Sequence, residues 1–496
     1  MPWHSPFTGA RYGFAFLISL STGCAGHSAK TLEARAALDA NQPAQARQLL
    51  NEALKVKTAN DFPAKAKDDD TLFILDRSMI SQQLEDYKAS SNDLQYADKA
   101  VEMLDLSRTA MSDVGKYIFS DDSGPYKGTP YEKAMINTMN MVNYLARHDL
   151  NGARIEARRL SIIQKYLREN KSPASGVNAP GGYVAGFVFE RSGKPNIALR
   201  YYDEALEFTE FKTLLEPISR LSHLGSFSSP RIQAFLKKHT AKEAKTPAST
   251  AATEESVDGD TAPALNSGNQ QKATKTESDN QVSELSPPES ELGDLLVVIN
   301  YGRVPAKVAK RIPIGLALTY ASLYMSAANR SSANRLAAQG LVTWINYPDM
   351  EEVHRKILVP TLHVDERAIA LEGAVAVDIL ARQAYEKDRG KIVASAITRL
   401  VARIIAGEAA GAAAKAASND SLVGAIVSIG TQAALTAADT PDTRSWSTLP
   451  ARMAVSRVRL APGKHHIEVR AQGLKKTVDF TMAPGGWEAI VLTVLK

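Results

Sequence analysis

Residues 190–206 read ERSGKPNIALRYYDEAL and decide the fold of the first half of the chain. Gly193 and Pro195 form a turn, because glycine accepts a left-handed backbone and proline fits the first turn of a helix. Ala198 and Ala205 are seven residues apart and share one helix face, where small side chains let a neighbouring helix approach closely. The stretch therefore predicts a tight helix–turn–helix hairpin.

Looser copies of this hairpin occur earlier in the sequence. Residues 38–54 repeat its layout, with Asn41 in the place of the turn glycine, and weaker copies lie near residues 92–100 and 148–155. The spacing resembles a tetratricopeptide-type array of about four helical hairpins, which stack into a curved solenoid with a concave surface because none can bury its apolar face alone. The alternative is a plain helical bundle with chance alanine spacing.

The start of the sequence resembles a bacterial lipoprotein signal. Residues 12–20 form an uncharged run after Arg11, too short to cross a hydrocarbon layer of about 30 Å as a helix. Small residues then lead into Cys24, the only cysteine in the chain, so we expect cleavage before Cys24 and acylation of its sulfur by chains such as palmitate. Alternatives are an ordinary secretory signal or a short uncleaved anchor. Ala25 replaces the aspartate that retains lipoproteins in the inner membrane, which favours the periplasmic face of the outer membrane.

Composition narrows the classes of function. The 496 residues are 44% hydrophobic and 23% charged, enough for real cores, and the net charge of +5 is modest for a nucleic-acid-binding protein. A single cysteine excludes an internal disulfide framework and a thiolate zinc site. We therefore expect no nucleic-acid partner and no small-molecule cofactor.

The sequence divides into five segments of different character. Residues 241–291 contain no aromatic residue and few large aliphatic ones, so we expect an acidic, disordered tether rich in Ser, Thr, Ala and Glu. The segments are a signal peptide (1–23), a helical repeat domain (24–240), the tether (241–291), an α+β region (292–450) and a β module (451–496).

The α+β region is predicted to contain strands at 295–300 and 355–364, followed by a long helix over 372–416. Residues 404–414 are mostly small, and residues 421–438 carry no charge. We expect two helices that pack closely because their side chains are small. The alternative is a hydrophobic hairpin inserted in a membrane, which the charges of the first helix and the polar side chains of the second disfavour.

Alternating polar and apolar residues begin at Met453 and predict four short strands with turns between them, typical of a small antiparallel sheet or sandwich. Residues 460–469, LAPGKHHIEV, resemble the PEGA module, a small β domain of bacterial envelope proteins. The expected fold is thus mainly α, a solenoid of tetratricopeptide-like hairpins, followed by an α+β region ending in this sheet.

Two further motifs are similar to those of a poorly characterised family of proteobacterial tetratricopeptide-containing outer-membrane lipoproteins. One is Pro130–Lys133 followed by residues 143–145 and 153–159, and the other is Ala438–Asp439 with Asp442–Trp446 and Leu449–Pro450. The order of segments is similar too. The resemblance implies an envelope lipoprotein and offers no settled activity.

Polar residues in these motifs have structural and functional interpretations. We expect Arg158 and Arg159 to form ion pairs between repeats near Glu156, or else to line a concave surface for an acidic peptide or glycan. Asp442, Arg444 and Trp446 are expected to lock the helices onto the β tail, with the arginine paired to a carboxylate and the tryptophan filling the joint; a ligand-binding role is the alternative.

The chain contains no catalytic or metal-binding motif that we recognise. His465 and His466 are adjacent on a predicted strand and point to opposite faces, which argues against a shared metal ion. Asp68–Asp70 lacks the glycine and glutamate of a calcium loop and is expected to start a helix. We name no catalytic, cofactor-binding or metal-binding residue.

The function expected from the sequence is that of a lipid-anchored periplasmic scaffold or adaptor rather than an enzyme. Its repeat groove would bind envelope proteins or peptides in cell-envelope assembly or maintenance. The alternatives are an envelope enzyme or peptidoglycan-synthesis regulator that acts on glycan through the C-terminal α+β region, and a structural subunit of a larger envelope complex.

Overall fold

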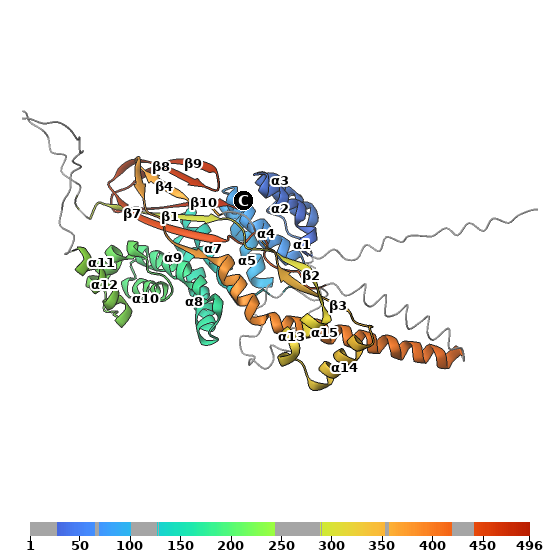
Figure 1. The fold of residues 1–496 in the computed structure, drawn as a ribbon. Coiled ribbons are helices and arrows are strands. Elements are labelled where there is room, and N and C mark those ends of the chain that lie inside the picture. The colour runs from blue at the N-terminus through green and yellow to red at the C-terminus, as the bar shows by residue number, and fades with distance from the viewer. Residues whose placement is uncertain are drawn as a thin grey trace, which may run out of the picture.

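The fold is seen in a computed structural model that describes residues 27–64, 69–100, 126, 128–243, 288, 290–352, 357–418 and 441–496. The N-terminal half consists of paired helices, as predicted (Figure 1). A short α1 (His27–Lys30) precedes five pairs: α2 (Leu32–Asp39) with α3 (Pro43–Ala53), α4 (Asp70–Gln83) with α5 (Tyr87–Ala100), α7 (Pro130–Ala146) with α8 (Leu150–Glu169), α9 (Asn178–Arg191) with α10 (Pro195–Leu206), and α11 (Leu215–Leu224) with α12 (Pro230–Glu243). The 3₁₀ turns η2 (Pro173–Val177) and η3 (Lys212–Leu214) precede α9 and α11.

The first four pairs share one turn. Each pair is joined by three residues, and the middle residue has a positive φ: Asn41 (58°), Glu85 (61°), His148 (55°) and Gly193 (66°). In every turn the next N–H donates to the carbonyl five residues earlier, at 2.8 or 2.9 Å, which is the Schellman arrangement that ends a helix. The prediction that Asn41 takes the place of Gly193 is confirmed. Glu85 and His148 take the same place in the turns of α4–α5 and α7–α8.

Small residues hold the helices of a pair close together. Ala198 and Ala205 are fully buried, as their spacing predicts. Gly186 of α9 lies directly under the ring of Tyr202 on α10, and a Cβ at this position would overlap the ring. The close approach of α9 and α10 therefore depends on a residue with no side chain.

The C-terminal half contains three sheets. Their strands are β1 (Gly293–Tyr301), β2 (Lys307–Pro313), β3 (Trp344–Met350), β4 (Thr361–Val364), β5 (Arg367–Ile369), β6 (Glu372–Ala376), β7 (Arg452–Leu460), β8 (Gly463–Ala471), β9 (Leu474–Met482) and β10 (Trp487–Val494). The first sheet has the order β10-β1-β7-β6, the second pairs β2 with β3, and the third has the order β5-β4-β8-β9. All pairings are antiparallel except β1 with β10, which is parallel.

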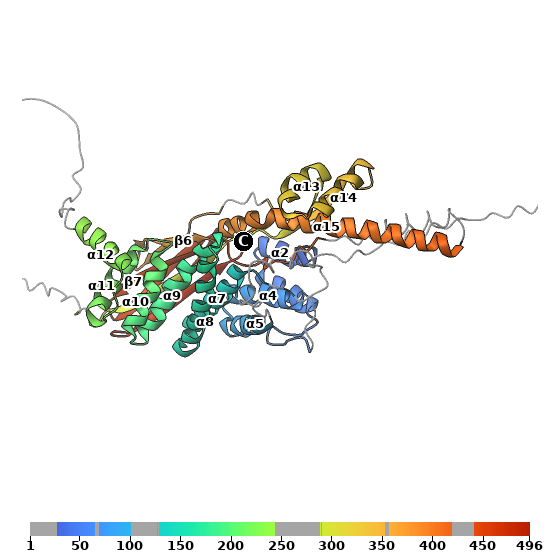
Figure 2. The same cartoon turned by 90° about the horizontal axis from the view of Figure 1, so that it is seen from below.

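Strand β1 lies in the middle of three layers. Its odd-numbered residues from Leu295 to Ile299 pack against the β5-β4-β8-β9 sheet, whereas Leu296 and Val298 pack against the helices. Successive side chains of a strand point to opposite faces, so a continuous apolar run serves both cores. Figures 1 and 2 show the resulting order of sheet, sheet and helices.

The four terminal strands form where the sequence predicts them, and they lie in two sheets that share one core, together with strands from the preceding region. Strands β8 and β9 pair with each other, whereas β7 and β10 flank β1 on its two sides, and β8 also pairs with β4. Strand β1 is buried along its whole length, so its backbone groups need a neighbouring strand on each side. Two terminal strands satisfy this requirement, and the β tail is thereby built into the preceding region.

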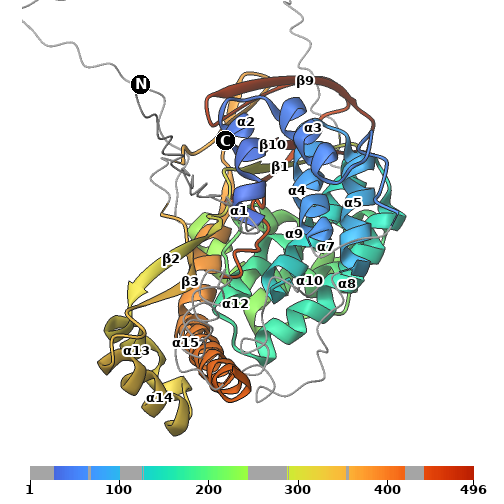
Figure 3. The ribbon, with the colours of Figure 1, turned by 90° about the vertical axis from the view of Figure 1, so that its right-hand side faces the viewer.

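A second, smaller core lies beside the main body. It contains the two-stranded β2–β3 sheet and, between these strands, α13 (Ile314–Ala321), the turn η4 (Ser322–Tyr324) and α14 (Ala327–Ala338). These elements pack against the middle of α15 (Val377–Ser418). We call β2, β3, α13, η4 and α14 the arm. Figure 3 shows that it projects from one side of the main body of sheets and helices. The predicted helix over 372–416 is confirmed from Val377 onward, while the residues before it form β6.

Several predictions concern residues outside the described ranges: the lipidated Cys24 with its signal peptide, nearly all of the 241–291 tether, and residues 421–438. Within the described ranges, no helix is both long enough and apolar enough to cross a membrane.

Candidate functional site

The concave face of the repeats is where the sequence analysis places a partner. Its lining helices α4, α7 and α9 are buried along nearly their whole length. The β10-β1-β7-β6 sheet lies against them, and side chains such as Met453, Val455 and Val491 share one core with Met135 and Phe187. The chain's own sheet therefore occupies the concave face.

Residues 441–451 form the joint between the helices and the sheet. The segment has no regular secondary structure and is almost entirely buried, so its backbone groups need partners outside a helix or sheet. Trp446 is 1% exposed, and its indole Nε1–H donates to the carbonyl of Leu75 on α4 at 3.0 Å. The prediction that Trp446 fills the joint is confirmed.

Two buried carboxylates of the helices accept further hydrogen bonds from this segment. Asp76 accepts the N–H of Thr448 at 2.9 Å and the hydroxyl groups of Ser447 and Thr448 at 3.1 and 3.0 Å. Glu132 accepts the N–H of Trp446 at 3.0 Å. Hydrogen bonds from a loop to charged acceptors are stronger than neutral ones, so both carboxylates fix the path of the joint.

The two motifs that carry the family resemblance therefore meet in space. Glu132 belongs to the first motif and also closes a capping box with Thr129 at the start of α7. Arg444 of the second motif pairs with Asp442, with Nε–Oδ1 and Nη2–Oδ2 distances of 2.9 and 3.0 Å. The pair braces the segment internally, and Trp446 makes the contact with the helices.

The other polar motif residues link neighbouring repeats. Arg159 on α8 lies 3.4 Å from Asp98 on α5, and Lys133 on α7 lies 2.8 Å from the same carboxylate. The expectation of ion pairs between repeats is confirmed for Arg159. Arg158 is exposed and forms no ion pair among the described residues.

A buried ionic cluster joins the helices to the sheet at a second place. Arg457 on β7 binds Glu190 on α9 with two hydrogen bonds, at 2.7 and 2.8 Å, and reaches Asp294 on β1 at 2.8 and 2.9 Å. Burial alone would raise the pKa of Glu190, but the charges of Arg457 and Arg191 hold this pKa well below its usual range. The cluster was not foreseen, because single charged residues in apolar stretches do not reveal which of them meet.

A chain of buried amides forms a third junction. Asn300 on β1 and Thr493 on β10 both donate to the Gln82 side-chain oxygen on α4, at 3.0 and 2.7 Å. Gln82 in turn donates to Asn143 on α7 at 2.8 Å. The only sequence signal was a polar Asn300 at the end of an apolar strand.

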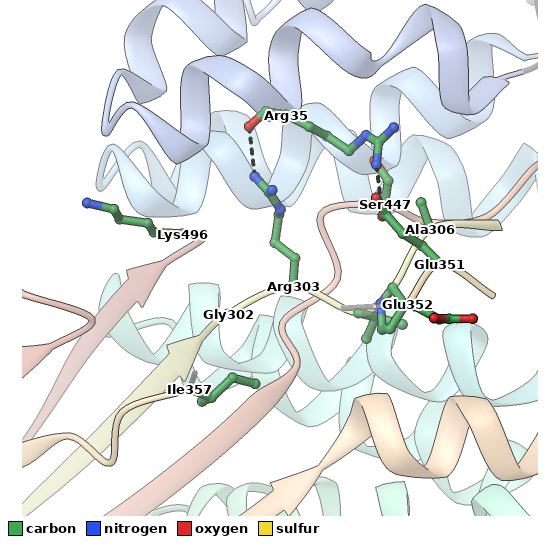
Figure 4. A pocket seen from close by; sticks show the side chains of 11 residues that line it. Arg35, Gly302, Arg303, Ala306, Glu351, Glu352, Ile357, Ser447 and Lys496 are labelled. Carbon is green, nitrogen blue, oxygen red and sulfur yellow. Dashed lines mark hydrogen bonds and ion pairs between the residues drawn. The ribbon is translucent and has the colours of Figure 1, made fainter. Parts of the chain in front are cut away.

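A hollow opens at the edge of this junction, between α2 and the end of β3 (Figure 4). Arg303 donates to the carbonyl of Arg35 at 3.1 Å, and the Arg35 guanidinium lies 3.3 Å from Glu351. Glu352 also lines the hollow, but it is 68% exposed and pairs with Lys310. The charges around the hollow are therefore mixed and largely paired with one another.

His465 and His466 lie on β8, and the described part of the aspartate run starts a helix. His465 bonds Asp365 and His466 bonds Asp479, so the two adjacent rings have different partners. Asp70 begins α4, and no three His, Cys, Asp or Glu side chains of the described ranges are placed to hold a metal ion.

Comparison with family models, with curated proteins and with solved structures gives no match to this chain.

Proposed function

We propose that the protein is a lipid-anchored scaffold of the bacterial envelope, held by Cys24 at the periplasmic face of the outer membrane, and that its helical repeats bind partner proteins through their outer face. The concave face is unsuitable because the chain's own sheet covers it.

The observation that carries this proposal is an apolar row on the outer face of α8. Ile155 and Ile162 are 50% and 56% exposed, although the other apolar residues of their helix are buried or partly buried. They are seven residues apart with Arg158 between them, so all three lie on one face. Exposed isoleucines beside a cation are typical of a surface that binds an apolar and acidic partner.

The enzyme alternative requires paired carboxylates in a deep cleft of the C-terminal region. Glu351 and Glu352 are the adjacent carboxylates at the hollow, and they lie at its open rim in ion pairs with Arg35 and Lys310. This arrangement gives the alternative no specific support.

Affinity purification from detergent-solubilised envelopes tests the scaffold. The wild-type chain is compared with the double variant Ile155→Asp, Ile162→Asp. Leu224→Asp is the matched control, because Leu224 is 68% exposed on α11. We expect partners that co-purify with the wild type and the control and are lost with the double variant. The proposal fails if the double variant retains every partner.

The lipid anchor is tested separately with Cys24→Ser. Metabolic labelling with an alkyne-tagged fatty acid should mark the wild type and leave the variant unmarked. Labelling of both, or of neither, would contradict acylation at Cys24.

A further inference from the structure

The arm combines exposed apolar side chains with an excess of positive charge. Leu323 is 89% exposed, and Leu316 and Trp344 are 44% and 47% exposed. Leu316 and Leu323 are seven residues apart, on the side of α13 and η4 opposite to the residues that pack against α15. Trp344 lies next to the start of α13, because the N–H of Ile314 bonds the carbonyl of Thr343.

Residues 295–348, which include all of the arm except the last two residues of β3, carry only positive charges. From Leu295 to Pro348 the sequence contains no Asp or Glu. Its Lys and Arg residues are Arg303, Lys307, Lys310, Arg311, Arg330 and Arg335. On α14, Arg330 and Arg335 are exposed and form no ion pair within the described ranges, while Arg311 lies 5.6 Å from the Trp344 ring centre.

The part of α15 that supports the arm has the same sign of charge. Residues 389–407 contain Arg389, Lys391, Arg399 and Arg403 but no acidic residue, although Arg389 and Lys391 pair with Glu386 and Asp388 on the same helix. Helices α13 and α14 and the part of α15 beneath them therefore carry basic side chains. The carboxylates that pair with Lys310, Asp349 and Glu352, lie at the end of β3 and just after it.

From this chemistry we propose that the arm docks on the surface of a membrane containing anionic phospholipid. Leucine and tryptophan side chains enter the boundary between headgroups and acyl chains, and arginines bind the lipid phosphates. A partner that is acidic but not apolar would account for the charge but not for a leucine almost wholly in water.

The start of the described chain places the arm on the side of the proposed anchor. His27 is buried against Phe73 and Asp76, and Cys24 precedes it by three residues, a reach of about 10 Å. Arg35 on α2 pairs with Glu351 just after β3, so the N-terminal helices lie beside the base of the arm. Figures 1 and 3 show α1 next to β2. The placement of the arm on the anchored side rests on the proposed acylation of Cys24, whereas the exposed apolar and basic side chains of the arm do not depend on it.

The experiment uses the full chain with Cys24→Ser, which has no other thiol. Leu323→Cys then provides a unique site for an environment-sensitive fluorophore, and Leu224→Cys on α11 provides the matched control. We expect vesicles with phosphatidylglycerol to shift the emission of the probe at 323 to the blue, and brominated lipid to quench it. The probe at 224 should change in neither assay. No change at 323, or equal changes at both sites, would overturn the proposal.

Sedimentation with the same vesicles tests the residues of the arm. Leu323→Glu with Trp344→Glu should lower the bound fraction at least tenfold, and Arg330→Glu with Arg335→Glu should do so in low salt. Ile155→Glu with Ile162→Glu, the exposed pair on α8, should bind like the parent. Equal binding of the arm variants and the parent, or equal binding to neutral phosphatidylcholine vesicles, would contradict docking on anionic lipid. Because no lipid anchor is present in these chains, failure here is distinct from failure of acylation at Cys24.

Discussion

Replacing Arg457 by methionine removes the cation that holds two buried carboxylates between the helices and the sheet. Glu190 and Asp294 are each 1% exposed at their side chains, and both bind this guanidinium. Arg191 stays near both of them, 2.9 and 2.8 Å away, and Arg220 still pairs with Glu190, so the loss of charge is partly compensated. Removing one partner of a buried ion pair costs about 3–5 kcal/mol, because the remaining charge is left without its partner.

Urea unfolding at pH 7 measures this cost, with the Cys24→Ser chain as the parent. Arg459→Met is the matched control, because Arg459 lies two residues further along β7 and pairs with Glu216, whose side chain is 44% exposed. We expect the control to lose less than about 1 kcal/mol, the usual value of an exposed pair. We expect Arg457→Met to lose about 3 kcal/mol or more.

The pH dependence separates a charge effect from a packing effect. In the parent the folded-state pKa of Glu190 lies below its ordinary value of 4.5, so its stabilising contribution is complete above pH 4.5 and is lost as the pH falls through the folded-state pKa. In Arg457→Met the largest influence that lowers the pKa of Glu190 is gone, so this buried carboxylate is protonated more readily and the deficit should shrink between pH 7 and pH 5. A deficit below about 1 kcal/mol at pH 7, or one that is equal at both pH values, would refute this reasoning.

Three further predictions follow from single contacts. Trp446→Ala should lower the free energy of unfolding by about 3–5 kcal/mol in urea titrations, because it empties the joint; a loss below about 1 kcal/mol would contradict the packing. Gly186→Ala should cost about 1–3 kcal/mol by thermal unfolding, since the new Cβ meets the Tyr202 ring, and an unchanged midpoint would show that the ring is free to move away. Burial opposes protonation of His465 but its hydrogen bond to Asp365 raises its pKa, so Asp365→Asn should lower that pKa in an NMR titration; an unchanged titration would exclude the pair. The stability that this pair contributes is present at low pH and is lost as the pH rises through the folded-state pKa of His465.

The local elements follow from sequence patterns that repeat at short range. Gly193 with Pro195 marks one turn clearly, and the alternation after Met453 locates the terminal strands closely. The turn at Glu85 was obscured because a non-glycine residue holds the positive φ there, at a cost that packing of the helices offsets.

Long-range pairing could not be predicted in the same way. The run from Leu295 to Ile299 is apolar on both faces, which indicates a central strand but does not identify its neighbours. The contacts of Arg457 with Glu190, and of Trp446 with Leu75, join residues more than 260 positions apart. No periodicity encodes such a contact, so the filling of the concave face became visible only in three dimensions.

The most direct test of the central claim, that the repeats hold the chain's own sheet, is cleavage of the connection between them. A specific protease site placed within residues 250–280, between α12 and β1, divides the folded protein into an N-terminal and a C-terminal fragment. If the sheet is held by the repeats, the two fragments elute together in size-exclusion chromatography and unfold in one shared transition. Arg457→Met should weaken their association. Separation of the wild-type fragments after cleavage, with independent unfolding of each, would contradict it.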